Sequence, residues 1–348
     1  MPSGSRFLFT AAAFVVVVAG MRAASDILVP FLLAVFISII CSPLLFWLKK
    51  KGVRNGLAVC STLIILLIFG MILVMFLGTS VHRFTNDLPF YQMRLTEQSA
   101  GIIAWVEGLG LDISAEAYEN IVNPGRVLGI AANTLKGMSG MLTNVFMILL
   151  TVLFILFEAS TLPRKIAAAM TGPEEDSLSQ LSGFMGGLNR YLAIKTLFSL
   201  LTGVAVGAWL AILGVDYPIL WGLLAFFLNY VPSIGSIIAA VPACLLALVQ
   251  LGVGPALLAV LGYLVVNFTF GNLLEPRFMG RRLGLSTLVV WLSLVFWGWV
   301  LGPLGMLLSV PLTMIVKIIL ESKEDTRRIA ILLGSGHAAP VLKPDADL

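Results

Sequence analysis

The sequence predicts an all-α, polytopic membrane protein with about six full spans and two further helical segments that are broken by Pro and Gly. Only 11% of the 348 residues are charged, whereas 59% are hydrophobic, and the mean hydropathy is +1.01. A soluble domain carries roughly 25% charged residues, so much of this surface must face lipid. Lipid pairs no backbone polar group, which restricts spanning segments to helices and closed barrels. The apolar runs are long and do not alternate with polar residues, and this pattern favours helices.

Six apolar runs are long enough to cross the hydrocarbon core of a membrane, which takes about 20 residues for roughly 30 Å. These predicted spans cover residues 7–24, 28–48, 57–77, 141–157, 193–213 and 255–274. The first run follows Arg6 and therefore also resembles a secretory signal. A second run begins almost immediately afterwards, which favours a retained helix.

Basic residues predict the orientation of these spans. The loop after the second span contains four basic residues and no acidic one: Lys49, Lys50, Lys51 and Arg54. Because basic loops stay in the cytoplasm, we expect that loop and both chain termini to be cytoplasmic. The chain then divides into three N-terminal spans (1–78), an extracytoplasmic amphipathic segment (79–140), a fourth span (141–158), a cytoplasmic amphipathic segment (159–192), a C-terminal core (193–320) and a cytoplasmic tail (321–348).

Two stretches in the C-terminal core, 217–249 and 285–316, are too long for one span and too short for two. They resemble each other, because Trp221 recurs 70 positions later as Trp291 and Gly235 recurs as Gly305. Each contains Pro close to Gly, where Pro removes a backbone donor and Gly permits a sharp reversal. We therefore expect two helical hairpins. Their predicted reversal residues are Pro232, Gly235, Gly302, Pro303 and Gly305.

The predicted topology makes the first hairpin open to the outside and the second to the cytoplasm, so the two would have opposed orientation. Paired Pro/Gly-broken segments in opposed repeats are typical of secondary transporters, whose substrate site lies near the membrane midplane. Short or tilted simple spans are the alternative interpretation. They would change the number of spans but not the sidedness of the chain.

Several other classes of protein lack support in the sequence. The three cysteines (Cys41, Cys60 and Cys244) have no close spacing, and the two histidines are far apart in the chain. No phosphate-binding loop occurs. We expect no cofactor, no metal site and no enzymatic activity. The formal net charge of +4 is small and fits basic cytoplasmic loops, so we expect no nucleic-acid partner.

Four stretches of the C-terminal core resemble the signature motifs of the autoinducer-2 exporter (AI-2E) family of bacterial permeases: 228–235, 271–280, 284–287 and 297–306. The resemblance covers nearly the whole chain and is strongest over 191–320. Much of the family has Pro where Thr287 stands, so Ser286-Thr287 narrows the match to the branch that includes autoinducer-2 export. The resemblance implies export of this quorum-sensing signal across the bacterial inner membrane, driven by an ion gradient or by the gradient of the substrate.

Two alternatives to this function stay open. Some members of the family are regarded as sodium/proton antiporters, so the resemblance leaves the substrate open, and proton or sodium coupling is one expectation. A membrane scaffold that transports nothing is the other alternative. We also expect contact with membrane lipid. Subunit contacts through the outer amphipathic segment would make the protein a homo-oligomer, for which a pentamer is one arrangement.

Autoinducer-2 is a small, polyhydroxylated molecule, so its site needs a few hydrogen-bonding groups in an otherwise apolar cavity. Hydroxyl groups that bond to their own helix, and asparagines that pack between helices, are the alternative roles for such residues. Asn267 and Asn272 do not share one face of a regular helix, so we expect an unwound stretch between them. The candidate substrate-binding residues are Asn229, Tyr230, Pro232, Ser233, Gly235, Asn267, Asn272, Ser286 and Thr287.

Glu275 is the most informative acidic residue of the core. It precedes Pro276, where we expect the helix to break. An ionisable residue next to a membrane span is a functional candidate. We expect Glu275 to bind a proton or a coupling ion, or to pair with Arg277 or Arg281. The candidate ion-coupling residues are Glu275, Arg277 and Asp216.

Overall fold

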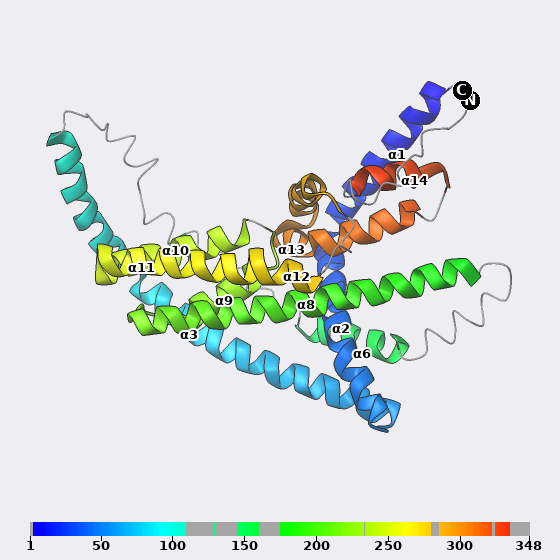
Figure 1. The fold of residues 1–348 in the computed structure, drawn as a ribbon, viewed down its shortest axis with the longest axis horizontal. Helices are drawn as coiled ribbons and strands as arrows, with labels where there is room; N and C mark the ends of the chain where they lie inside the picture. The colour runs from blue at the N-terminus through cyan, green and yellow to red at the C-terminus, as the bar shows by residue number, and fades with distance from the viewer. Residues whose placement is uncertain are drawn as a thin grey trace. The chain divides into compact units, whose positions relative to one another are not determined.

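Every element of regular structure in the described part of the chain is a helix (Figure 1). The structure is a computed structural model, and it describes residues 3–108, 129, 145–159, 175–232, 234–279, 285–321 and 324–334. Most of the predicted outer segment after residue 108, part of the predicted cytoplasmic segment (160–174) and the end of the predicted tail (335–348) lie outside the described residues.

The N-terminal part consists of α1 (Ser3–Ala23), α2 (Ser25–Lys50) and α3 (Asn55–Gly108). The turn between α2 and α3 contains Gly52, whose φ of 86° suits glycine. α3 passes residue 78 without interruption, so the third span and the first part of the predicted outer segment form one helix. Its apolar side chains lie largely on the surface; Met71, for example, is 72% exposed. Such exposure is expected of a helix that faces lipid.

Each of the six predicted spans corresponds to a helix or to part of one. The remaining three are α6 (Val145–Ala159), α8 (Glu175–Leu213) and the continuous run from α11 through η2 to α12, residues 253–279. Five helical stretches of the described residues are long and apolar enough to cross a membrane: Ser25–Lys50, Asn55–Tyr91, Gly186–Leu213, Val253–Phe278 and Thr287–Glu321. The prediction of an all-α polytopic membrane protein is confirmed.

The chain forms two compact units. Unit 1 comprises Met1–Cys60, Met147–Ile194 and Pro276–Leu348, and unit 2 comprises Ser61–Phe146 and Lys195–Glu275. The core of unit 2 is built around Trp221, which is fully buried and meets the ring of Phe84 edge-on. In unit 1, a smaller apolar cluster joins Val18 of α1 to Trp297 of α13.

The first predicted hairpin is present in unit 2. It consists of α9 (Pro218–Leu228), a turn over residues 229–234 and α10 (Gly235–Leu251). Pro218 begins α9, where its missing N–H has no partner to lose. Gly235 permits the tight turn, because a Cβ atom there would lie 1.8 Å from the carbonyl oxygen of Leu228.

The second predicted hairpin is present in unit 1, within α13 (Thr287–Glu321). Its backbone reverses at Gly302, where φ is 70° and ψ is −154°. The two arms lie side by side, because the indole N–H of Trp297 donates to the hydroxyl of Thr313 at 3.0 Å. The hairpins belong to different units, so their opposed orientation stays a prediction. A final amphipathic helix, α14 (Glu324–Leu333), follows α13.

Candidate functional site

The candidate site is built on α8 and on the continuous helix formed by α11 (Val253–Val266), η2 (Asn267–Leu274) and α12 (Glu275–Met279). α11 lies alongside α8 (Figure 1). The indole N–H of Trp209 on α8 donates to the carbonyl oxygen of Leu258 at 2.9 Å. Gly262 provides room for the Trp209 ring, because a Cβ atom there would lie 2.1 Å from its nitrogen.

η2 is a π-helix, and it explains how the chain passes Pro276. The expected helix break at Glu275 is wrong, because Glu275 has helical angles (φ −51°, ψ −48°) and the chain continues into α12. In a regular α-helix the ring of Pro276 would clash with the carbonyl group of Asn272. A π-helix is wider, with hydrogen bonds between residues five apart, and the N–H of Glu275 donates to the carbonyl of Phe270. The wider turn accommodates the proline without a break.

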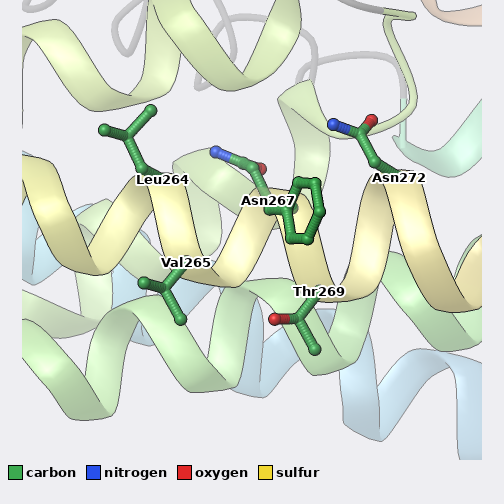
Figure 2. A pocket seen from close by; sticks show the side chains of 6 residues that line it. Leu264, Val265, Asn267, Thr269 and Asn272 are labelled. Carbon is green, nitrogen blue, oxygen red and sulfur yellow. The ribbon is translucent and has the colours of Figure 1, made fainter.

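The π-helix also arranges two of the predicted substrate-binding residues. Figure 2 shows the carboxamides of Asn267 and Asn272 extending from the same side of the helix, with Thr269 on the opposite side. Residues five apart lie close to one face in a π-helix, so the expected unwound stretch is replaced by a widened one. A cavity of about 450 Å³ lies against this stretch of the helix, and its lining consists of Leu264, Val265, Asn267, Phe268, Thr269 and Asn272.

The tip of the first hairpin rests on α8 through two neutral hydrogen bonds. The amide nitrogen of Asn229 donates to the hydroxyl of Ser199 at 3.0 Å. The hydroxyl of Tyr230 donates to that of Thr196 at 2.8 Å. Two of the three polar residues predicted at this tip, Asn229 and Tyr230, are therefore directed at α8. Ser233 lies outside the described residues, and Pro232 lies half-buried in the turn.

Next to these bonds lies a buried ion pair that sequence reasoning missed. The ammonium group of Lys195 on α8 is 2.7 Å from Oε1 of Glu275, and the two residues are only 7% and 8% exposed. The partner expected for Glu275 was Arg277 or Arg281; Arg277 is exposed, and Arg281 lies outside the described residues. One signal could have identified Lys195, because it is the only basic residue between Arg190 and Arg277.

These contacts bring α8, the first hairpin and α12 together in one group of polar side chains, which we call the tip cluster. Its members are Lys195, Thr196, Ser199, Asn229, Tyr230 and Glu275. Buried charges are tolerated only when they are paired, and a buried hydroxyl needs a hydrogen-bonding partner. The tip cluster meets both conditions, and its neutral members can exchange partners at small energetic cost.

Asp216 does not belong to the tip cluster. It follows the C-terminal end of α8 at Leu213, which is roughly 27 Å along the helix from Lys195. Its carboxylate accepts a hydrogen bond of 2.7 Å from Tyr91 of α3, and its backbone N–H donates to the side chain of Gln250. The predicted ion-coupling residues Glu275 and Asp216 therefore occupy separate places in unit 2.

Tyr217, next to Asp216, also forms a hydrogen bond with a side chain of α3. Its hydroxyl donates to the carboxylate of Asp87 on α3. Burial, followed by the hydrogen bond to Asp87, raises the pKa of Tyr217 to about 12. Tyr217 is also the only described non-glycine residue with a positive φ, of 58°. This polar contact and the contact of Tyr91 with Asp216 join α3 to the base of the first hairpin.

Ser286 and Thr287 lie at the start of α13 in unit 1. The hydroxyl of Ser286 accepts a hydrogen bond from the backbone N–H of Val289 at 3.2 Å, which is a helix-capping contact. Thr287 is exposed at the first helical position. A substrate-binding role for these two residues stays a prediction.

The chain is similar to known transport proteins along most of its length. Residues 10–325 match the family model described as AI-2E family transporter. The AI-2 transport protein TqsA of Escherichia coli is 41% identical over 331 residues, which cover 95% of this chain and 96% of that protein. A candidate transport protein of the same organism, YhhT, is 40% identical over 335 residues, which cover 96% of each chain. A candidate transport protein of Haemophilus influenzae is 40% identical over 334 residues, which cover 94% of this chain and 96% of that protein.

Proposed function

Because this chain belongs to the AI-2E family of transporters, we propose that it is a secondary transporter of the bacterial inner membrane that exports autoinducer-2. The similarity to TqsA, whose name states transport of AI-2, supports this substrate. The names of YhhT and of the Haemophilus influenzae relative state transport without a substrate. The choice of substrate therefore depends on TqsA and on the chemistry of the site.

The observation that carries the proposal is that unit 2 contains two surfaces with hydrogen-bonding groups on its apolar helices: the tip cluster and the shared face of Asn267 and Asn272. A polyhydroxylated solute needs both donors and acceptors, and a carboxamide supplies both. Asn229 and Tyr230 are tied to α8 by neutral hydrogen bonds, which typically contribute about 1 kcal/mol each. A solute hydroxyl group can replace such a bond at little net cost.

In the proposed mechanism, the hairpin tip alternates between its contact with α8 and contact with the solute. Release of the tip opens a polar path on one side of the membrane, and its return closes that path. This is alternating access around a broken helix, for which half-helices near the midplane are the usual structural basis. The energy source is the substrate gradient or an ion gradient that acts through Glu275.

Sodium/proton exchange is the second candidate function, and one observation favours it. Glu275 is a buried carboxylate within a membrane-spanning helix, and such residues often mark ion pathways. Against it stands the contact with Lys195, because an ammonium group at 2.7 Å already occupies the position that a cation would take. Autoinducer-2 export is therefore the better-supported function.

Transport assays in proteoliposomes test the proposal. We expect the purified protein to release labelled autoinducer-2 faster than empty liposomes do. N229A should lower this flux about tenfold, which corresponds to the loss of about 1.4 kcal/mol. T313V is the matched control, because it also removes one hydrogen bond of a hairpin, the 3.0 Å bond to Trp297, but away from the proposed path. Autoinducer-2 flux equal to that of empty liposomes, together with proton release on adding sodium, would reject export in favour of exchange.

A further inference from the structure

α8 holds the α11–η2–α12 helix at two points, one on each side of the π-helix. On the N-terminal side, Trp209 bonds to Leu258 and packs on Gly262. On the C-terminal side, Lys195 pairs with Glu275. Lys195 and Trp209 are fourteen positions apart on α8, which is almost four full α-helical turns, so both project from nearly the same face.

A regular α-helix could not satisfy both contacts. Glu275 comes thirteen positions after Gly262. At about 100° per residue, an α-helix would place Glu275 roughly 140° around the axis from Gly262 and direct it away from α8. π-helical turns advance less per residue, because their hydrogen bonds join residues five apart. The π-helix therefore rotates Glu275 back toward Lys195.

The same widening aligns the two asparagines. In an α-helix, Asn267 and Asn272 would also lie roughly 140° apart. In η2 they project from the same side (Figure 2). The direction of Glu275 and the shared face of the asparagines thus depend on one local geometry. Whatever stabilises that geometry at Glu275 also brings two of the cavity-lining side chains, Asn267 and Asn272, to one side of the helix.

We propose that the Lys195–Glu275 ion pair holds η2 in its π-helical form and so keeps Asn267 and Asn272 on one face, which makes Lys195 a positioning residue of the transport site. This rests on the proposed function as far as the solute is concerned, but the geometric part stands without it. Breaking the pair lets η2 return to α-helical geometry and separates the two carboxamides. An ion or a proton that competes for Glu275 would then act on the solute site from a distance.

Pro276 offers a competing explanation, because its ring alone favours a widened turn before it. Removal of the ion pair separates the two causes. The double variant K195M/E275Q removes both charges and therefore leaves no unpaired buried charge that would unfold the protein. K195R keeps the positive charge and is the conservative variant.

Electron paramagnetic resonance on labelled cysteines measures the geometry directly. The full chain, with Cys41, Cys60 and Cys244 replaced by alanine, carries nitroxides at N267C and N272C in lipid nanodiscs. We expect dipolar broadening typical of labels on one helix face. The matched control is V260C/V265C, an exposed pair with the same spacing on the regular helix α11, which should show weaker broadening.

Adding K195M/E275Q should reduce the broadening of the N267C/N272C pair to that of the control pair, and adding K195R should retain it. Broadening that persists in K195M/E275Q would overturn the proposal and assign the π-helix to Pro276 alone. Absence of broadening before any charge is removed would overturn it as well.

A parallel flux assay distinguishes this inference from the proposed function. We expect autoinducer-2 flux to fall in N267A/N272A and, to a similar extent, in K195M/E275Q. If flux is unchanged in N267A/N272A while the spectra change as expected, the ion pair positions the asparagines but these do not bind the solute. That result would reject Asn267 and Asn272 as the substrate site but would support Lys195 as a positioning residue.

Discussion

The two hairpins carry the same sequence signals but reverse the chain differently. Gly235 in the first and Gly305 in the second have the same role, since a Cβ atom would lie 1.8 Å from the carbonyl of Leu228 and 2.0 Å from that of Trp297, respectively. The first hairpin needs a separate turn over residues 229–234. The second reverses at Gly302, whose backbone angles are non-helical and which separates two helical arms.

The polar contacts of the two hairpins differ more than their backbones. Asn229 and Tyr230 at the first tip bond to α8. Trp297 and Thr313 of the second hairpin bond to each other. A tip tied to a neighbouring helix can move against it, whereas a bond between two arms closes the hairpin on itself. The Pro/Gly signal thus predicts a reversal, and the polar residues around it determine whether the tip contacts a neighbouring helix.

The largest expected effect is on stability, and it tests the glycine that both hairpins share. G235A and G305A should each lower the free energy of unfolding by about 3 kcal/mol, because the new Cβ meets backbone that cannot rotate away. Unfolding in SDS, followed by tryptophan fluorescence, measures this. G254A is the control, since a Cβ atom at Gly254 meets nothing within 4 Å. If G305A were as stable as G254A, the two glycines would not have equivalent roles.

A smaller effect on stability is expected at the position where one hairpin has glycine and the other has proline. Gly302 lies 70 positions after Pro232, so the second hairpin places glycine where the first has proline. The backbone angles of Gly302 are accessible almost only to glycine, and G302A should cost about 1–3 kcal/mol although its Cβ would meet no atom. P232A should cost less than about 1 kcal/mol, through the unfolded state. Equal losses of stability in both variants would remove the distinction between the two reversals.

The smallest effect concerns the base of the first hairpin and depends on pH. The raised pKa of Tyr217, about 12, means that folding stabilises its protonated form. This contribution is complete below the ordinary tyrosine pKa of about 10 and is lost as the pH rises toward 12. Y217F should lower stability by about 1 kcal/mol at pH 8 and should weaken its decline between pH 10 and 11. Identical alkaline declines for Y217F and the unchanged protein would show that Tyr217 does not titrate with unfolding.

A comparison of individual residues shows how much of the candidate site could be predicted from the sequence. Asn229, Tyr230 and Glu275 were predicted, and they converge on one stretch of α8. Lys195 was missed because a single lysine near a predicted helix end has an ordinary explanation in contact with the membrane interface. Asp216 was grouped with Glu275 because both are rare acidic residues in an apolar core. The structure places Asp216 beyond the C-terminal end of α8, whereas Glu275 pairs with Lys195 near the middle of that helix.

The sequence by itself determined the class of the protein, its main helices and the existence of two reversals. These follow from local properties: the length of apolar runs, the missing donor of proline and the freedom of glycine. Only the tertiary structure decided the π-helix, the partner of Glu275 and the common face of Asn267 and Asn272. The physical reason is that these features depend on how the residues of the α11–η2–α12 helix line up with those of α8. Pro276 signals locally that the helix before it is perturbed, but no local pattern in the chain records that Lys195 and Trp209 of α8 will meet this helix.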